Sequence, residues 1–177
     1  MTPSGPDDGE GGPAAKVALR AQMRVLRRSI SDADGPRRSE LIGARLRAVV
    51  AQRLEDEPPP IWRRGVVMVF TPIRGEPRLD ELVDWCRSAD LATVVPEEGP
   101  DPARVDVVVV PGLAFTADGH RLGQGGGWYD RFLVRLPERV LTVGVGFAEQ
   151  LVDALPVEPH DVPLDLIVTD DGTASAA

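Results

Sequence analysis

The sequence has little cysteine, no long apolar run and no excess of positive charge. Its one cysteine, Cys86, cannot form an internal disulfide and is expected to be a packed thiol, consistent with a reducing cytoplasm. No apolar stretch approaches the roughly 18 residues that span a bilayer, and the first dozen residues lack the basic and apolar regions of a secretory signal. The net charge of −8 argues against nucleic acid as a partner. We therefore expect a cytoplasmic protein that binds neither membrane nor nucleic acid.

The chain length predicts a single domain. Its 177 residues are enough for one buried core and too few for two domains of ordinary size. Residues 1–13 are rich in glycine, proline and acidic residues, so we expect a disordered tail there. Residues 14–170 are expected to form the domain and residues 171–177 a loose tail. We expect a monomer.

The hydrophobic pattern predicts an α/β fold. Amphipathic helices are expected at 14–30 and about 37–54, separated by a break at Ser31-Asp-Ala-Asp-Gly-Pro36. Apolar, β-branched runs and further helical segments then alternate along the chain. The expected strands are 65–70, 91–95, 105–110, 140–147 and 166–168, and the expected helices are 79–89 and 129–136. This order predicts a Rossmann-like, three-layer α/β/α domain with a largely parallel sheet of about five strands.

The most informative stretch follows the strand at 105–110 and includes Arg121-Leu-Gly-Gln-Gly-Gly-Gly-Trp-Tyr-Asp130. Glycines can turn several main-chain N–H groups toward one anion, and a helix starting after them adds its own unpaired N–H groups. Arg121 offers a guanidinium suited to phosphate, and Asp130 a carboxylate that could hold magnesium. The pattern predicts a phosphate site, with a flexible glycine turn as the alternative. It matches neither a P-loop nor the first turn of a dinucleotide fold.

Pro111-Gly-Leu-Ala-Phe115, followed by the segment from Arg121 to Asp130, resembles the signature of the 5-formyltetrahydrofolate cyclo-ligases, also called methenyltetrahydrofolate synthetases. The resemblance implies an enzyme that uses ATP and Mg²⁺ to convert 5-formyltetrahydrofolate to 5,10-methenyltetrahydrofolate. ADP and phosphate are released, and the reaction passes through a phosphorylated formyl intermediate. It also implies ATP contacts from Arg121, Leu122, Gly123, Gln124, Gly125, Gly126, Gly127, Trp128 and Tyr129.

Two segments outside the signature extend the resemblance. Lys16-Val-Ala-Leu-Arg20 matches the Lys-x-x-Leu/Met-Arg form of the family's first helix, which implies that Lys16 and Arg20 meet the ATP phosphates. A spacing of four places both on one helix face, and a solvated basic face is the alternative. Lys16 and Arg121 are the catalytic candidates. Asp161 matches a family carboxylate near the metal, so Asp130 and Asp161 are the expected magnesium ligands.

The chain departs from the family pattern on the substrate side. The resemblance implies folate contacts from Glu76, Gly125, Trp128 and Tyr129, but the usual Glu-x-Asp-Thr context is reduced to Glu76-Pro-Arg-Leu79. Trp128 stands where the family usually has tyrosine. Only nine residues, 96–104, occupy the place of a longer segment that helps to cover the pterin in the family.

Two alternatives therefore stay open. The chain could be an ATP-dependent ligase or kinase for another pterin or small heterocycle, which would explain the short segment. It could also be a nucleotide-binding relative with little catalysis. His160, next to Asp161, is expected to be a turn residue rather than a catalyst.

Overall fold

The computed structural model describes residues 13–158 and 161–175, and a six-stranded sheet forms its centre. The strand order is β2-β1-β3-β6-β7-β8; every pair is parallel except β7 and β8, which are antiparallel. The strands are β1 (Val66–Met68), β2 (Ala92–Val94), β3 (Val107–Pro111), β6 (Leu141–Val145), β7 (Leu166–Val168) and β8 (Thr173–Ser175). The largely parallel sheet predicted from the sequence is confirmed, with β8 as an additional antiparallel edge strand.

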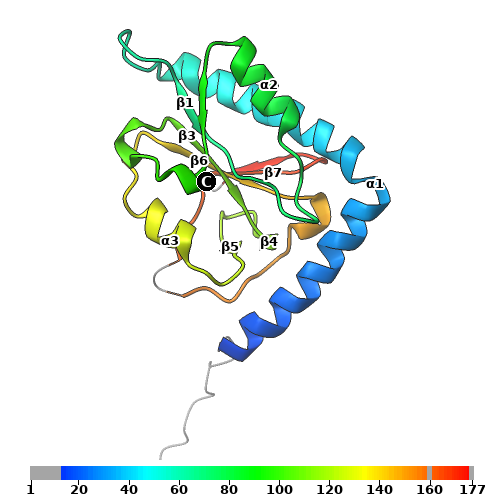
Figure 1. Ribbon diagram of the computed structural model, residues 1–177. Coiled ribbons are helices and arrows are strands. Elements are labelled where there is room, and N and C mark those ends of the chain that lie inside the picture. Colours follow the sequence, from blue (N-terminus) through cyan, green and yellow to red (C-terminus); the bar gives the residue numbers. More distant parts are fainter. Residues whose placement is uncertain (1–12, 159–160, 176–177) are drawn as a thin grey trace, which may run out of the picture.

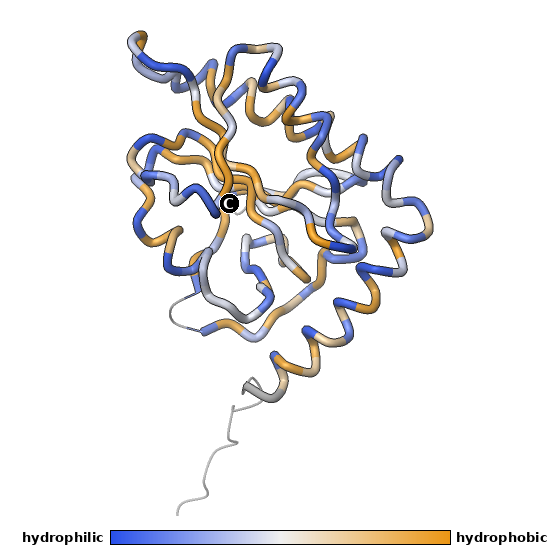
Figure 2. Tube along the Cα trace, in the orientation of Figure 1, coloured by the Kyte–Doolittle hydropathy of each residue, from blue (hydrophilic) through white to orange (hydrophobic). Residues whose placement is uncertain are grey.

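Helices cover both faces of this sheet. Side chains alternate along β3, so that Val107 and Val109 join one hydrophobic cluster while Val108 and Val110 join another. The first cluster includes side chains of α1 (Pro13–Asp56) and α2 (Asp80–Ser88), and the second includes those of α3 (Trp128–Leu133). Figure 1 shows the resulting three layers, and Figure 2 shows the hydrophobic strands running between them. The three-layer α/β fold is thus confirmed.

Helix α1 contains the break predicted at 31–36, because two helical stretches meet there at a kink. It continues from Pro13 to Asp56, with one residue of non-helical backbone at Asp34 (φ −152°, ψ 26°), two positions before Pro36. Proline disfavours helical backbone at the preceding residues, so the expected break is a kink within one helix. The second half of α1 packs beside α2, whereas the first half runs past the segment that carries the glycines (Figure 1).

Three other segments refine the prediction. The connection from β3 to α3 contains an antiparallel pair, β4 (Ala114–Phe115) and β5 (Arg121–Leu122), which the sequence did not suggest. The short segment 96–104 forms two turns of 3₁₀ helix, η1 (Pro96–Glu98) and η2 (Pro102–Arg104). The expectation of a loose tail over 171–177 is wrong for Thr173–Ser175, because these residues form β8.

The predictions for residues 1–12 and for His160 lie outside the described residues. Among the helices of the described part, none is both long and apolar enough to cross a membrane.

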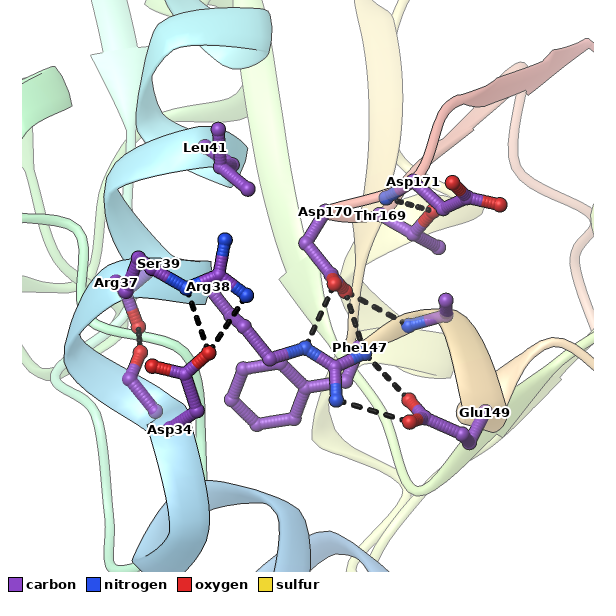
Figure 3. Close-up of polar contacts among 12 residues, drawn as sticks. Asp34, Arg37, Arg38, Ser39, Leu41, Phe147, Glu149, Thr169, Asp170 and Asp171 are labelled. Atoms are coloured by element: carbon purple, nitrogen blue, oxygen red, sulfur yellow. Dashed lines mark hydrogen bonds and ion pairs between the residues drawn. The ribbon is translucent and has the colours of Figure 1, made fainter.

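Polar contacts fasten the second half of α1 to the carboxyl ends of β6 and β7 (Figure 3). The guanidinium of Arg38 donates to Asp170 at 2.6 and 3.0 Å and to Glu149 at 2.9 Å, and it lies over the Phe147 ring. Burial alone would raise the pKa of Asp170, but Arg38 and the main-chain N–H of Ala148 hold it below its usual 3.8. The same arginine lowers the pKa of Glu149. This network holds the helix over the sheet edge that faces the site.

Candidate active site

A cavity of about 310 Å³ opens at the carboxyl ends of β1 and β3, between the first half of α1 and the segment from β5 to α3. This edge is where open parallel sheets bind ligands. Every residue that the sequence put forward as a ligand contact lines it: Lys16, Arg20, Glu76, Arg121, Leu122, Gly123, Gln124, Gly125, Gly126, Gly127, Trp128, Tyr129, Asp130 and Asp161. The fold thus brings together segments from the two ends and the middle of the chain.

The glycine segment has the features of an anion nest. Gly125 (φ 104°) and Gly127 (φ 63°) adopt backbone angles that are rare for other residues. The main-chain N–H groups of residues 124–127 donate no hydrogen bond to any residue that the structure describes. Consecutive unpaired N–H groups that line a cavity bind oxyanions such as phosphate. Two of the four glycines in this loop thus have positive φ, whereas Gly123 and Gly126 do not.

Two of the three predicted cations of the site, Lys16 and Arg121, are paired with its predicted metal-binding carboxylates. Lys16 Nζ donates to Glu158 Oε2 at 2.8 Å and to Asp161 Oδ2 at 3.0 Å. Burial alone would lower the pKa of Lys16, but these two carboxylates raise it above its usual 10.5, so the ammonium stays charged. Arg121 likewise donates to Asp130 Oδ1 at 2.7 Å. Carboxylates of the cavity lining thus hold both Lys16 and Arg121.

The donor set is compatible with magnesium but does not form a compact metal centre. Across residues 13–158 and 161–175, no three His, Cys, Asp or Glu side chains gather as a metal-binding group. Asp130 and Asp161 nevertheless line the same cavity as the anion nest. Magnesium commonly takes one or two carboxylates and completes its shell with phosphate oxygens and water, so these residues fit a phosphate-bound ion.

Glu76 is held at the cavity by a buried ion pair. Arg27 Nη1 donates to Glu76 Oε1 at 2.9 Å and to the Gly112 carbonyl at 3.3 Å, and the Ile73 N–H donates to Glu76 Oε2 at 3.1 Å. Arg27 and Glu76 are only 2% and 8% exposed. Burial lowers the pKa of Arg27 even beside this carboxylate. Glu76 therefore has a fixed carboxylate position at the end of β1.

A second cavity of about 340 Å³ adjoins the first. It is lined by Phe70, Thr71, Ile73, Glu76, Pro96, Glu97, Pro111, Trp128 and Tyr129. Four of these residues also line the first cavity, namely Glu76, Pro111, Trp128 and Tyr129. The short segment 96–104 contributes Pro96 and Glu97, so it does reach the place where the sequence suggested a missing cover.

The aromatic residues between the two cavities are closely packed. Trp128 stacks on Phe132 with ring centroids 4.9 Å apart and meets Tyr129 edge-on, also at 4.9 Å. The Arg121 guanidinium lies 5.5 Å from the centre of the Tyr129 ring. Within the described residues, the buried Tyr129 hydroxyl has no hydrogen-bond partner, and burial raises its pKa. Trp128 thus both packs α3 and faces the ligand space.

Comparison with known proteins gives these cavities a context. Residues 89–170 match the sequence model of the 5-formyltetrahydrofolate cyclo-ligase family. A relative from Mycoplasma pneumoniae with that name is 27% identical over 88% of this chain and 99% of its own length. A solved 5,10-methenyltetrahydrofolate synthetase from Mycoplasma pneumoniae superposes with a TM-score of 0.72 at 26% identity, over 88% of this chain and 98% of that one.

Residues 89–170, just under half of the chain, thus resemble the 5-formyltetrahydrofolate cyclo-ligase family. The chain's match to the mouse 5-formyltetrahydrofolate cyclo-ligase is 36% identical but covers 46% of this chain and 42% of that protein. The chain thus spans less than half the length of this family member, and the family model covers the half that holds the glycine segment and Asp161. The first half of α1, which supplies Lys16 and Arg20, lies outside the family-model match.

Sequence reasoning assigned no contact to four residues that the structure places at the cavities or the glycine loop. Glu158 pairs with Lys16, Arg27 pairs with Glu76, and Arg24 donates to the side-chain and main-chain oxygens of Gln124. A fourth residue, Pro111, lines both cavities. Basic residues recur at positions 16, 20, 24 and 27, a spacing that places them on one helical face. Extending the predicted pair of cations along this face would have found Arg24 and Arg27.

Proposed function

We propose that this chain converts 5-formyltetrahydrofolate to 5,10-methenyltetrahydrofolate with consumption of ATP. The observation that carries this proposal is the meeting of two cavities at Glu76, Pro111, Trp128 and Tyr129. One cavity has an anion nest and cations, and the other has an aromatic and apolar lining with a few polar groups. The names of the relatives and of the solved structure support the same reading.

ATP is proposed to bind in the first cavity. The unpaired N–H groups of residues 124–127 would receive phosphate oxygens, and Lys16 and Arg121 would exchange their carboxylate partners for phosphate. Asp130 and Asp161 would hold Mg²⁺, which neutralises charge on the phosphate oxygens. Charge stabilisation and positioning supply most of the catalysis of phosphoryl transfer, so no nucleophilic side chain is needed.

The reduced folate is proposed to bind in the second cavity, with its pterin against the Trp128 and Tyr129 rings. The Tyr129 hydroxyl and the fixed Glu76 carboxylate would supply its polar contacts. The formyl oxygen attacks the γ-phosphorus of ATP, which forms an O–P bond and releases ADP. N10 then attacks the activated carbon and loses its proton, a C–N bond forms, and the C–O bond breaks as phosphate leaves with that proton. The shared wall of the cavities would bring the formyl oxygen and the γ-phosphate together.

The test is the appearance of the near-ultraviolet absorbance band of methenyl folate with purified protein, Mg-ATP and 5-formyltetrahydrofolate. We expect an ATP-dependent rise in the wild-type protein and its loss in Arg121→Ala, because this change removes the cation beside the nest and frees Asp130. ATP binding without any rise would contradict the proposal.

One observation favours a second candidate, an ATP-dependent ligase or kinase for another pterin or small heterocycle. The segment 96–104 contributes only Pro96 and Glu97 to the second cavity, which leaves room for a different ring system. Phosphate release that responds to such a compound, and not to 5-formyltetrahydrofolate, would establish this candidate.

The single cysteine is consistent with the reducing cytoplasm, where we propose that the reaction takes place.

A further inference from the structure

Three arginine side chains donate hydrogen bonds to carbonyl groups of the glycine segment. Arg20 Nε donates to the carbonyl of Gly123 at 3.0 Å. Arg24 Nη2 donates to the carbonyl of Gln124 at 3.2 Å, and Arg131 Nη2 donates to the carbonyl of Gly126, also at 3.2 Å. Arg20 and Arg24 come from α1, and Arg131 comes from α3. The loop is therefore fixed from two separate elements.

These carbonyl contacts set the direction of the neighbouring N–H groups. In a trans peptide the C=O of one residue and the N–H of the next point in opposite directions, and the described chain has no cis peptide bond. A carbonyl held by an arginine therefore turns the following N–H away from that arginine. The N–H groups fixed in this way belong to Gln124, Gly125 and Gly127, and none of them has an acceptor among the described residues.

Glycine makes such fixing necessary. Residues 123–127 include four glycines, and ordering the backbone of one residue costs about 1–2 kcal/mol, with glycine at the upper end. If the loop is already ordered before the ligand binds, the binding free energy is not reduced by this entropic cost. Hydrogen bonds from a charged donor are also stronger than those between neutral groups. The arginines thus pre-organise the nest.

We propose that Arg24 and Arg131 are positioning residues of the phosphate-binding loop. Neither lines the cavity, so neither contacts the ligand, and both act through the main chain. Arg24 also donates to the Gln124 side-chain oxygen at 3.1 Å, which gives it two contacts on one loop residue. The inference rests on the proposed function, because it assumes that the loop receives the phosphates of a nucleotide.

The experiment compares Arg24→Gln and Arg131→Gln with two matched controls, Arg28→Gln and Arg135→Gln. Each control removes one positive charge four residues further along the chain, from α1 for Arg28 and from just after α3 for Arg135. Within the described residues, the side chains of Arg28 and Arg135 form no hydrogen bond and no ion pair. Dissociation constants for Mg-ATP and for pyrophosphate are measured by calorimetry, and ¹⁵N relaxation reports the order of the glycine amides without ligand.

We expect Mg-ATP and pyrophosphate to bind about tenfold more weakly to each positioning variant, the effect of losing one charge-assisted hydrogen bond. The controls should stay within about twofold of wild type, since they lose only distant, screened charge. The order parameters of the Gly125 and Gly127 amides should fall in Arg24→Gln and Arg131→Gln and stay unchanged in the controls.

Three results would overturn the inference. Wild-type affinity and wild-type amide order in Arg24→Gln and Arg131→Gln would refute it and leave the proposed function intact. Equal weakening in the controls would show that only total charge matters. Failure of the wild-type protein to bind either Mg-ATP or pyrophosphate would overturn both the inference and the proposed function.

Discussion

The buried ion pair between Arg27 and Glu76 gives the sharpest prediction of stability. Its side chains are 3% and 6% exposed, and its one direct contact is 2.9 Å long. The substitution Arg27→Met keeps most of the buried apolar stem and removes the charge. Among the residues that the structure describes, it leaves the Glu76 carboxylate with only the Ile73 N–H as a donor, and it removes the guanidinium from the Gly112 carbonyl. An uncompensated carboxylate would then stay buried beside the cavity.

Breaking one side of a buried ion pair costs about 3–5 kcal/mol, which is a large part of the roughly 5–15 kcal/mol that stabilises a typical domain. We therefore expect Arg27→Met to lower the free energy of unfolding by about 3 kcal/mol or more. The variant Arg27→Met/Glu76→Gln should recover much of this loss, because the amide carries no charge into the apolar surroundings. The two substitutions should be clearly non-additive.

Urea denaturation of the wild-type protein, both single variants and the double variant measures these terms as one cycle. The wild-type and variant m-values must agree for the comparison to hold. A loss below about 1 kcal/mol in Arg27→Met, or a cycle that is additive within about 0.5 kcal/mol, would refute the reasoning about the buried pair.

Three further predictions follow from other contacts. Arg38 lowers the pKa of Asp170 and of Glu149 in the folded protein. The stability that these carboxylates contribute is therefore fully present above their usual pKa values of 3.8 and 4.5, and it is lost as the pH falls through their lower pKa values in the folded state. Urea denaturation from about pH 6 to 3 should show a smaller loss in Arg38→Met than in wild type, and equal losses would argue against this linkage. Gly144→Ala should cost about 1–3 kcal/mol and lower Tm, since its Cβ would lie 2.7 Å from an Ile167 methyl carbon; an unchanged Tm would contradict this packing. Cys86 is fully buried, and burial raises its pKa to about 11. A thiol reagent at about pH 8 should therefore modify Cys86 only when the protein unfolds, and rapid reaction of the folded protein would disprove its burial.

The sequence allowed the sheet to be predicted because its central strands, β3 and β6, are buried on both faces. The run at 107–110 is apolar without interruption, and in the structure its side chains alternate between two hydrophobic clusters. The two-residue strands β4 and β5 were not predictable in this way. Their pairing depends on contacts such as Leu113 N–H to the Leu122 carbonyl, which local propensity does not encode. The kink of α1 at Asp34, in contrast, falls within the break predicted from the Ser31–Pro36 segment.

The candidate site was predictable to the extent that a contiguous signature carries it. Positions 121–130 lie together in the sequence and line one cavity. The partners of those residues were harder to find, since Lys16 meets Glu158 from 142 positions away. Such pairs depend on how the first half of α1 crosses the end of the sheet. The second cavity combines the ends of β1 and β3 with α3, and only the folded chain brings these segments together.

The central claim is that a phosphoryl group passes from a nucleotide in the first cavity to a formyl folate in the second. The most direct measurement is the ratio of phosphate released to methenyl folate formed in one reaction mixture. The account predicts a one-to-one ratio, with little phosphate release when the folate is omitted. Phosphate release that is independent of 5-formyltetrahydrofolate, or methenyl folate formation without ATP consumption, would contradict the claim.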